Sequence, residues 1–108
     1  MQIGEVWYAK FPYDDKPGFT RRPVIILDID SLLVLSVKVT KHEPRSSDKF
    51  DTPILYWQEA NLRMVSTARI SKVISIPKSD FIHKIGDLYP DDFDAVKVQY
   101  VAFLSESE

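Results

Sequence analysis

The sequence predicts a mainly β domain that ends in an α-helix. Up to residue 76, short segments rich in β-branched and aromatic residues alternate with stretches that contain Pro, Gly and Asp, which is the pattern of strands joined by turns. Beyond residue 90, apolar residues recur every three to four positions instead, which favours a helix. A chain of 108 residues is long enough to bury one hydrophobic core, so we expect a single domain over residues 1–108.

Several segments have the composition of strands. They cover residues 3–11, 22–29, 32–40, 52–57 and 66–76. In the third of them, Val37 and Val39 alternate with polar residues, which indicates a strand with one covered face. Only Asp30 and Ser31 separate the second segment from the third, so we expect a tight antiparallel hairpin there.

The last part of the chain predicts helical structure. We interpret residues 78–88 as a short helix, with Ser79 as its N-cap and Gly86 at its end. Pro90 and the aspartates that follow it are typical of the start of a second helix, because the helix macrodipole favours negative charge there. Apolar residues then recur at helical spacing at Phe93, Val96, Tyr100 and Leu104.

A strand remains an alternative for the final segment, because Val96, Val98 and Tyr100 also alternate. We favour the helix. About five mostly antiparallel strands, followed by a short and a longer helix, fit a small and strongly bent barrel with a helix packed against it.

Composition bounds the class of protein. The chain has no cysteine, which excludes disulfide bridges and thiolate metal sites. No apolar run is long enough to cross a bilayer, and the first residues lack the basic and apolar regions of a signal peptide. We therefore expect a cytoplasmic protein with no membrane association.

The charges are unevenly distributed. The net charge of −2 argues against a protein held on nucleic acid by bulk electrostatics alone. Residues 1–72, however, hold 11 Lys and Arg against 9 Asp and Glu, whereas residues 73–108 hold 3 against 7. We therefore expect any anion site in the first two thirds of the chain.

Arg21 and Arg22 stand directly before Pro23 at the start of an apolar strand. The simpler interpretation is a solvated strand end. The alternative is an anion site, because a proline restricts the residue before it to extended conformations and so gives the Arg22 side chain a defined direction. Arginine is also the residue suited to bidentate phosphate contact.

Other polar residues are weaker candidates when taken alone. Thr40, Ser66 and Arg69 lie on strands, where such groups often only bond a neighbouring backbone group. His42 and Glu43 are adjacent, so on an extended chain their side chains point to opposite faces. Gly-rich phosphate loops, hydrolase motifs and paired carboxylates at metal-site spacing are absent from the sequence. The residues alone thus indicate a small β-rich domain with a candidate anion site.

Read in order, four stretches of sequence are similar to one known family. They are "GEVWYAKFPYDDKPG" with "RRPVIIL", then "LSVKVT", "STARISKVISIPKSDFIHKIGDL" and "DDFDAVKVQYVAFL". Together they resemble the MazF/PemK/Kid family of toxin endoribonucleases from bacterial toxin–antitoxin systems, over nearly the whole chain. The arginine–proline strand start and the S-x-x-R strand are the specific parts of this resemblance.

The resemblance implies a CcdB/MazF-type SH3-like barrel that forms a homodimer, with RNA lying across the dimer interface. It also implies a sequence-selective mRNA interferase that cleaves single-stranded RNA without a metal or other cofactor. In that reaction the ribose 2′-hydroxyl attacks the adjacent phosphate and leaves a 2′,3′-cyclic phosphate and a 5′-hydroxyl. An antitoxin peptide that occupies the RNA groove is the expected inhibitor.

The resemblance also assigns residues. Arg22, Thr40 and Arg69 correspond to catalytic residues of the family. The residues expected to contact RNA are Lys16, Thr20, Arg21, Lys41, His42, Ser66 and Ser71, with base readout in the segments 13–20 and 41–51. The family branch with the second arginine has an acidic residue where this chain has Ser71, and it has a histidine in the loop where residues 13–20 have none. The general base is therefore open between a glutamate, Lys16 and His42.

A rival hypothesis is a non-catalytic relative of the same fold that binds a protein, as the gyrase inhibitor CcdB does. The acidic last third and Ser71 favour this rival, whereas Arg22 and Thr40 favour the ribonuclease. Inhibition of gyrase would depend on residues near the C-terminus. A plain nucleic-acid-binding barrel is a third interpretation, but residues 67–73 lack the interleaved aromatic residues of a stacking platform.

Overall fold

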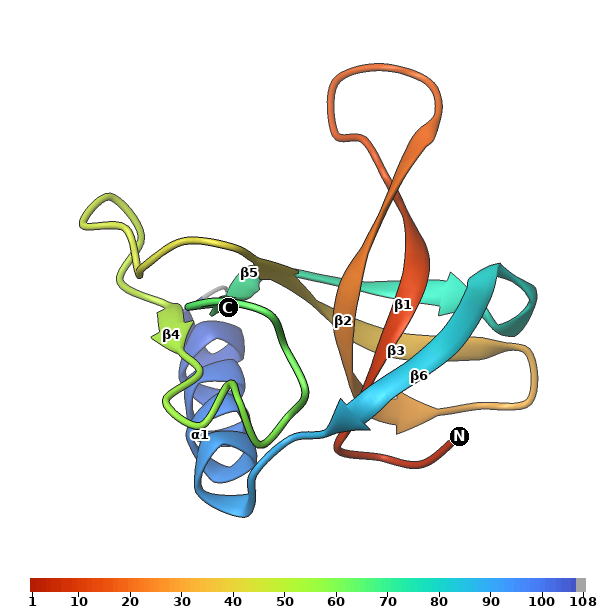
Figure 1. Cartoon of the computed structure of the whole chain (residues 1–108). Helices are drawn as coiled ribbons and strands as arrows, with labels where there is room; N and C mark the ends of the chain where they lie inside the picture. The colour runs from red at the N-terminus through yellow and green to blue at the C-terminus, as the bar shows by residue number, and fades with distance from the viewer. Residues whose placement is uncertain (107–108) are drawn as a thin grey trace.

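The computed structural model describes residues 1–106 and has one curved antiparallel sheet with a C-terminal helix (Figure 1). The elements are β1 (Glu5–Pro12), β2 (Phe19–Ile29), β3 (Leu33–Thr40), β4 (Asp51–Pro53), β5 (Thr67–Pro77), the 3₁₀ turn η1 (Lys78–Asp80), β6 (Phe81–Asp87) and α1 (Pro90–Glu106). The strand order is β4-β5-β3-β2-β1-β6, so β4 and β6 are the edges of the sheet. The predicted mainly β fold with a C-terminal helix is confirmed.

The largest irregularity in strand pairing lies in β5. Val37 of β3 pairs with Val73, but the next residue, Lys38, pairs with Arg69. Residues 70–72 are therefore extra residues on β5, and a bulge of this kind bends a strand and redirects its side chains. Smaller register shifts occur between β1 and β6 and between β2 and β3.

The two faces of the sheet carry different cores. Successive residues of a strand point to opposite faces, so Ile25 and Val24 of β2 belong to different clusters. The larger cluster includes Val96 of α1, whereas the smaller one contains Ala9, Phe11, Val24 and Ile76 and no residue of the helix. Lys38 is paired with Val24 and therefore stands on the face that bears the smaller cluster.

The helix α1 confirms the helical interpretation of the final segment. Its Asp92 side chain is buried and accepts hydrogen bonds from the backbone N–H groups of Leu55 (3.0 Å) and Tyr56 (2.9 Å). These bonds attach the start of the helix to the chain that follows β4. Within residues 1–106, no helix is long and apolar enough to span a membrane.

The strand expected at residues 52–57 is wrong beyond Pro53. Ile54 N–H still donates to the Ser66 carbonyl, which continues the β4–β5 register by one residue. The next two N–H groups, of Leu55 and Tyr56, donate to the Asp92 side chain and so leave the ladder. Turns therefore replace the second half of the predicted strand.

The short helix expected at residues 78–88 is also wrong. Residues 78–80 form only the 3₁₀ turn η1, with no side-chain cap, and residues 81–87 form β6 along the free edge of β1. Gly86 does not end a helix. A Cβ atom at this position would lie 2.4 Å from the carbonyl oxygen of Ala60, so the absence of a side chain lets the chain after β4 pack against β6.

The β1–β2 hairpin projects beyond the sheet (Figure 1). Tyr13 donates a hydrogen bond to the carbonyl of Gly18 (3.1 Å), and Gly18 has a φ of 101°, which favours glycine. The hairpin is also attached to β5, because Lys72 Nζ lies 2.5 Å from Asp14 Oδ2. Asp14 has a lowered pKa, mainly because of this hydrogen bond.

Glu5 is a buried carboxylate at the start of β1. Its oxygens accept hydrogen bonds from the Gln2 backbone (2.7 Å) and the Trp7 indole (2.9 Å), and Lys84 Nζ lies 3.0 Å away. Burial alone would raise the pKa of Glu5, but the hydrogen bonds and the charge of Lys84 outweigh it and lower the pKa from 4.5 to about 2.

We expect Glu5→Gln to destabilise the protein by about 2 kcal/mol at neutral pH and progressively less in acid. The folded-state pKa is depressed, so the contribution of the carboxylate is present above pH 4.5 and is lost as the pH falls toward 2. Thermal unfolding of both proteins across this range is the measurement. A difference in unfolding free energy between wild type and Glu5→Gln that stayed constant down to pH 2 would contradict the lowered pKa of Glu5.

Candidate functional site

Arg22 is a half-buried cation on β2 with few partners. Its Nη1 donates one long hydrogen bond to the carbonyl of Val39 (3.4 Å), and its buried Nε has no hydrogen-bond partner among the described residues. Burial lowers the pKa of Arg22, the charge of Arg69 lowers it further, and Tyr13 opposes the shift. The guanidinium is therefore desolvated without a compensating carboxylate.

Thr40 ends β3 beside this arginine. Its hydroxyl is buried, and it too has no hydrogen-bond partner in the described part of the chain. Val24 of β2 pairs with Lys38 of β3. Because the two strands are antiparallel, Arg22, two residues before Val24, lies opposite Thr40, two residues after Lys38. Two polar groups with unused hydrogen-bonding capacity thus meet at one end of the β2–β3 ladder.

Lys38 and Arg69 add positive charge to the same region. They are opposite each other on β3 and β5, and Arg69 is buried. Burial lowers the pKa of Lys38, and the charges of Arg22 and Arg69 lower it further. Lys38 was missed from sequence, although its position two residues before Thr40 placed it on the same face of the strand.

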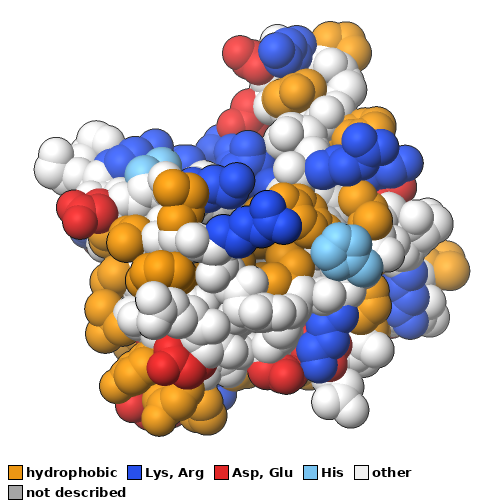
Figure 2. Space-filling model, viewed as in Figure 1, with side chains coloured by type: hydrophobic (Ala, Val, Ile, Leu, Met, Phe, Trp, Pro, Cys, Tyr) orange, Lys and Arg blue, Asp and Glu red, His pale blue; other side chains and the backbone are white. Residues whose placement is uncertain are grey.

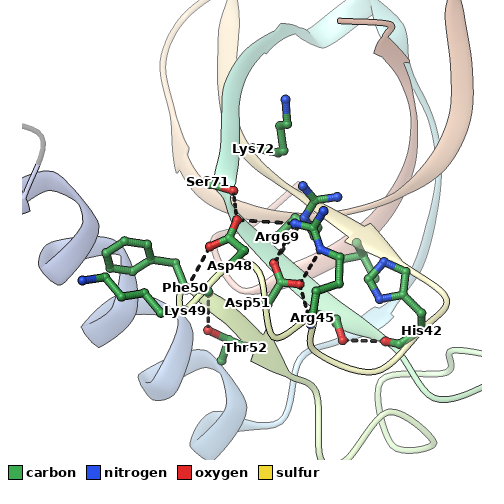
Figure 3. Close-up of polar contacts among 12 residues, drawn as sticks. His42, Arg45, Asp48, Lys49, Phe50, Asp51, Thr52, Arg69, Ser71 and Lys72 are labelled. Atoms are coloured by element: carbon green, nitrogen blue, oxygen red, sulfur yellow. Dashed lines mark hydrogen bonds and ion pairs between the residues drawn. The ribbon is translucent and has the colours of Figure 1, made fainter.

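Asp51 holds Arg69 in place (Figure 3). Its carboxylate is fully buried, and Oδ1 lies 3.2 Å from Arg69 Nε in an ion pair whose geometry falls outside that of a hydrogen bond. Arg45 approaches the same carboxylate through its backbone N–H (3.0 Å) and Nε (2.9 Å). Burial would raise the pKa of Asp51, but the bonds and charges of the two arginines keep it below the usual value.

Asp48 brings a carboxylate to Ser71. The Ser71 hydroxyl donates to Asp48 Oδ2 at 2.6 Å, and Arg45 Nη2 contacts the same oxygen at 3.4 Å (Figure 3). The resemblance implied an acidic residue at position 71, and here a carboxylate reaches that position from the segment before β4. Sequence reasoning missed Asp48 and Asp51 because they are distant in the chain from β5.

The remaining predicted RNA-binding residues lie in separate places. Lys16 is in the hairpin loop with its Nζ 4.5 Å from the centre of the Tyr13 ring, and Arg21 is exposed on the opposite face from Arg22. Thr20 is half-buried opposite Phe11.

Of the three predicted RNA-binding residues that flank β3 and β5, two already contact backbone carbonyl groups of the chain. Lys41 is exposed after β3. His42 Nδ1 lies 2.6 Å from the Glu43 carbonyl, and the buried Ser66 hydroxyl donates to Met64 (2.8 Å). The structure thus brings Arg22, Thr40 and Arg69 together, but it does not gather all the predicted contacts at one point.

Arg22, Lys38 and Arg69 lie close enough for their charges to affect one another, so this region is cationic. In the view of Figure 2, Lys and Arg side chains form a band across the middle of the molecule, with hydrophobic side chains beside them. Across residues 1–106, no group of three or more His, Asp and Glu side chains is arranged to hold a metal ion. The arrangement is suited to binding an anion such as a phosphate through hydrogen bonds and charge.

A family model described as PemK-like, MazF-like toxin of type II toxin–antitoxin system matches residues 2–103. The chain belongs to this family. The resemblance drawn from the sequence is therefore confirmed, and the MazF-like chain carries its cationic cluster within the matched region. A search of curated proteins by sequence found no match.

Solved structures agree on the fold of this MazF-like chain. A MazE–MazF complex from Deinococcus radiodurans matches with a TM-score of 0.74 and 14% identity, covering 97% of this chain and 96% of the other. An endoribonuclease in complex with its cognate antitoxin from mycobacterial species gives 0.73 and 12%, covering 97% and 95%. The Mycobacterium tuberculosis toxin MazF-mt6 gives 0.68 and 19%, covering 92% and 96%. The predicted MazF-type, SH3-like barrel is confirmed, as a curved sheet whose edges β4 and β6 are not paired with each other.

Proposed function

We propose that the protein is a sequence-selective, metal-independent endoribonuclease toxin that cleaves single-stranded RNA. The observation that carries this proposal is the pair of unsatisfied polar atoms, Arg22 Nε and Thr40 Oγ1, beside a cluster of positive charge. Buried polar atoms without partners are rare in folded proteins, and an ordered water, an ion or a ligand commonly supplies the missing bond. Family membership supports RNA as the ligand class, because an endoribonuclease in complex with its antitoxin is among the structural neighbours of this MazF-like chain.

In the proposed reaction, the 2′-oxygen forms a bond to the adjacent phosphorus as its proton passes to a base. The bond from phosphorus to the 5′-oxygen then breaks, and the departing oxygen takes up a proton. Arg22 and Thr40 donate hydrogen bonds to the non-bridging oxygens, on which negative charge grows, and Arg69 and Lys38 add positive charge. Fixed donors aimed at developing charge lower the barrier, and removal of one such donor typically costs roughly 10²–10³ in rate.

The proposal includes partners and an assembly. An antitoxin protein that covers the cationic surface would inhibit the enzyme, as complexes of toxin and antitoxin among the structural neighbours suggest by analogy. A homodimer is consistent with the exposed apolar side chains of α1, of which Val98 is 67% and Val101 63% exposed. A cytoplasmic location follows from RNA as the substrate.

The test is incubation of a long single-stranded RNA with the purified protein in the presence of EDTA. We expect discrete fragments that end in a 2′,3′-cyclic phosphate and begin with a 5′-hydroxyl. Replacing the ribose at a mapped cleavage site by 2′-deoxyribose should abolish cleavage there, because the attacking hydroxyl is gone. RNA that is bound but remains intact under all conditions would refute the enzyme.

A gyrase-type inhibitor that acts by binding a protein is the second candidate. The exposed apolar residues of α1, close to the C-terminal end, are the observation that favours it. Arg22→Ala separates the two candidates, because an inhibitor of that kind would keep its toxicity after this substitution. A ribonuclease would lose its activity after Arg22→Ala.

A further inference from the structure

Lys38 is a half-buried lysine on a central strand, between Arg22 and Arg69. Its direct partners are Val24 of β2 and Arg69 of β5, and the Cβ atoms of residues directly opposite each other lie about 5 Å apart. Arg22 is two residues before Val24, so it is a diagonal neighbour of Lys38, at about 7–8 Å. Three cations from three adjacent strands therefore share one face of the sheet.

The ammonium group of Lys38 has no carboxylate partner of its own. Within residues 1–106, no Asp or Glu forms an ion pair with it. Its Nζ lies 5.6 Å from the centre of the Phe11 ring, which belongs to the smaller apolar cluster. The charge of Asp14 in the hairpin loop reaches Lys38, but this carboxylate is bonded to Lys72. The ammonium is thus available to a ligand.

Lys38 holds its proton less tightly than an ordinary lysine does. Burial lowers its pKa most, and the charges of Arg22, Arg69 and Lys72 lower it further. Asp14 acts in the opposite direction without cancelling the shift. An ammonium group whose pKa is closer to the working pH donates its proton more readily, so Lys38 is a better acid than a lysine in water.

The proposed reaction needs a proton donor at the departing 5′-oxygen. An alkoxide is a poor leaving group, and a positioned general acid typically contributes about 10²–10⁴ in rate. Arg22 and Arg69 are unsuited to this step, because a guanidinium keeps its proton at any pH at which proteins work. Of the three cations, Lys38 alone carries a proton that can be transferred.

We propose that Lys38 is the general acid of the ribonuclease and donates a proton to the departing 5′-oxygen. The inference rests on the proposed function and assigns a step that it left open. As the 2′-oxygen forms its bond to phosphorus, the bond from phosphorus to the 5′-oxygen breaks and that oxygen keeps the electron pair. The Lys38 proton moves onto this pair and gives the 5′-hydroxyl. The neutral amine then regains a proton from water.

The experiment uses two short RNA oligonucleotides that span one mapped cleavage site. In one of them the departing atom is the natural 5′-oxygen, and in the other it is sulfur. A thiolate departs without a proton, because a thiol has a pKa of only about 8.5. Loss of the general acid should therefore slow cleavage of the oxygen substrate and spare the sulfur substrate. The measured quantity is the single-turnover cleavage rate.

Lys38→Arg keeps the positive charge but removes the transferable proton. We expect it to lower the rate on the oxygen substrate by roughly 10²–10⁴-fold and to change the rate on the sulfur substrate little. Lys38→Met is the second variant, because it relieves repulsion with Arg22 and Arg69 and so favours the folded state. It should also slow the oxygen substrate more than the sulfur substrate. Thermal unfolding checks the fold of both variants.

Lys10→Arg is the matched control. Lys10 also lies against a phenylalanine ring, with its Nζ 4.9 Å from the centre of Phe19. It pairs with Arg21, whereas its neighbour Ala9 pairs with Arg22, so Lys10 stands on the opposite face of the sheet from Arg22. The same exchange of lysine for arginine should here leave the cleavage rates of both substrates unchanged.

The pH profile of wild type gives a readout that needs no variant. The ammonium form of Lys38 is the acid, so kcat/KM for the oxygen substrate should fall as the pH rises through the Lys38 pKa. Because that pKa is lowered, the fall should begin below the ordinary lysine range. The fall should be much weaker with the sulfur substrate, which needs no proton.

Three results would overturn the inference. In the first, Lys38→Arg cleaves the oxygen substrate as fast as Lys10→Arg does, which leaves the ribonuclease standing with another proton donor. In the second, the folded Lys38 variants slow both substrates equally, as Arg22→Ala should, which makes Lys38 a binding charge only. In the third, the alkaline fall of wild type is the same for both substrates. Failure of wild type to cleave any RNA would refute the proposed function itself.

Discussion

Replacing Arg22 by alanine is expected to lower RNA cleavage by roughly 10²–10³-fold while leaving thermal stability unchanged or raised. The loss of rate follows from removing a donor that, in the proposed reaction, bonds the phosphate. The effect on stability has a separate cause. Arg22 has a buried Nε without a partner, one long hydrogen bond of 3.4 Å, and a pKa lowered by burial and by the charge of Arg69. The free protein therefore gains little from this side chain.

Two measurements check this prediction: the cleavage rate at saturating RNA and the midpoint of thermal unfolding. Arg21→Ala is the matched comparison, because it removes the same charge from the neighbouring residue on the opposite face of the strand. We expect it to weaken RNA binding by less than about tenfold and to leave the rate at saturation nearly unchanged. Equal cleavage by Arg22→Ala and wild type would remove Arg22 from the reaction.

Replacing Asp51 by asparagine is expected to destabilise the protein by about 3 kcal/mol and to impair cleavage as well. The buried carboxylate bonds Arg45 and lies 3.2 Å from Arg69 Nε. Asparagine is uncharged and turns an N–H donor toward the guanidinium donors. Arg69, whose side chain is only 11% exposed, would then be a buried charge without a partner.

Asp94→Asn is the control for this second substitution. Asp94 is 3.4 Å from Lys97 on the exposed side of α1, and its side chain is 73% exposed. Loss of such a surface pair typically changes stability by less than about 1 kcal/mol. Chemical unfolding of both variants measures the difference, and equal losses of unfolding free energy in the two would contradict a structural role for Asp51. Because the pKa of Asp51 is lowered, its contribution should disappear as the pH falls below the ordinary aspartate range.

Local patterns predicted most of the fold, and distant contacts account for the errors. The strands around Val24 and Val37 follow from apolar residues in extended runs, and the helix from the spacing of Phe93, Val96 and Tyr100. Residues 81–87 carry no comparable local signal. They are a strand because the edge of β1 offers backbone partners, and that edge is more than 60 residues away in the chain.

In the candidate site, too, local motifs predicted some residues and distant contacts supply the others. Arg22, Thr40 and Arg69 could be proposed from sequence because the order of short motifs resembles a family. The groups that hold or surround them could not, because they come from separate elements: Lys38 from β3, Asp48 and Asp51 from the chain around β4.

The attachment of the β1–β2 hairpin through Lys72 and Asp14 should make the RNA selectivity of the proposed ribonuclease depend on ionic strength. Asp14 is 61% exposed and Lys72 33% exposed, so dissolved ions compete with this pair. At physiological salt the Debye length is about 8 Å, and an exposed pair contributes little. We expect the hairpin loop to be held by this pair in dilute buffer and to move more freely as salt is added. If the loop reads bases, as the sequence suggested, a cleavage motif determined in dilute buffer should be narrower than one determined at the salt concentration of a cell.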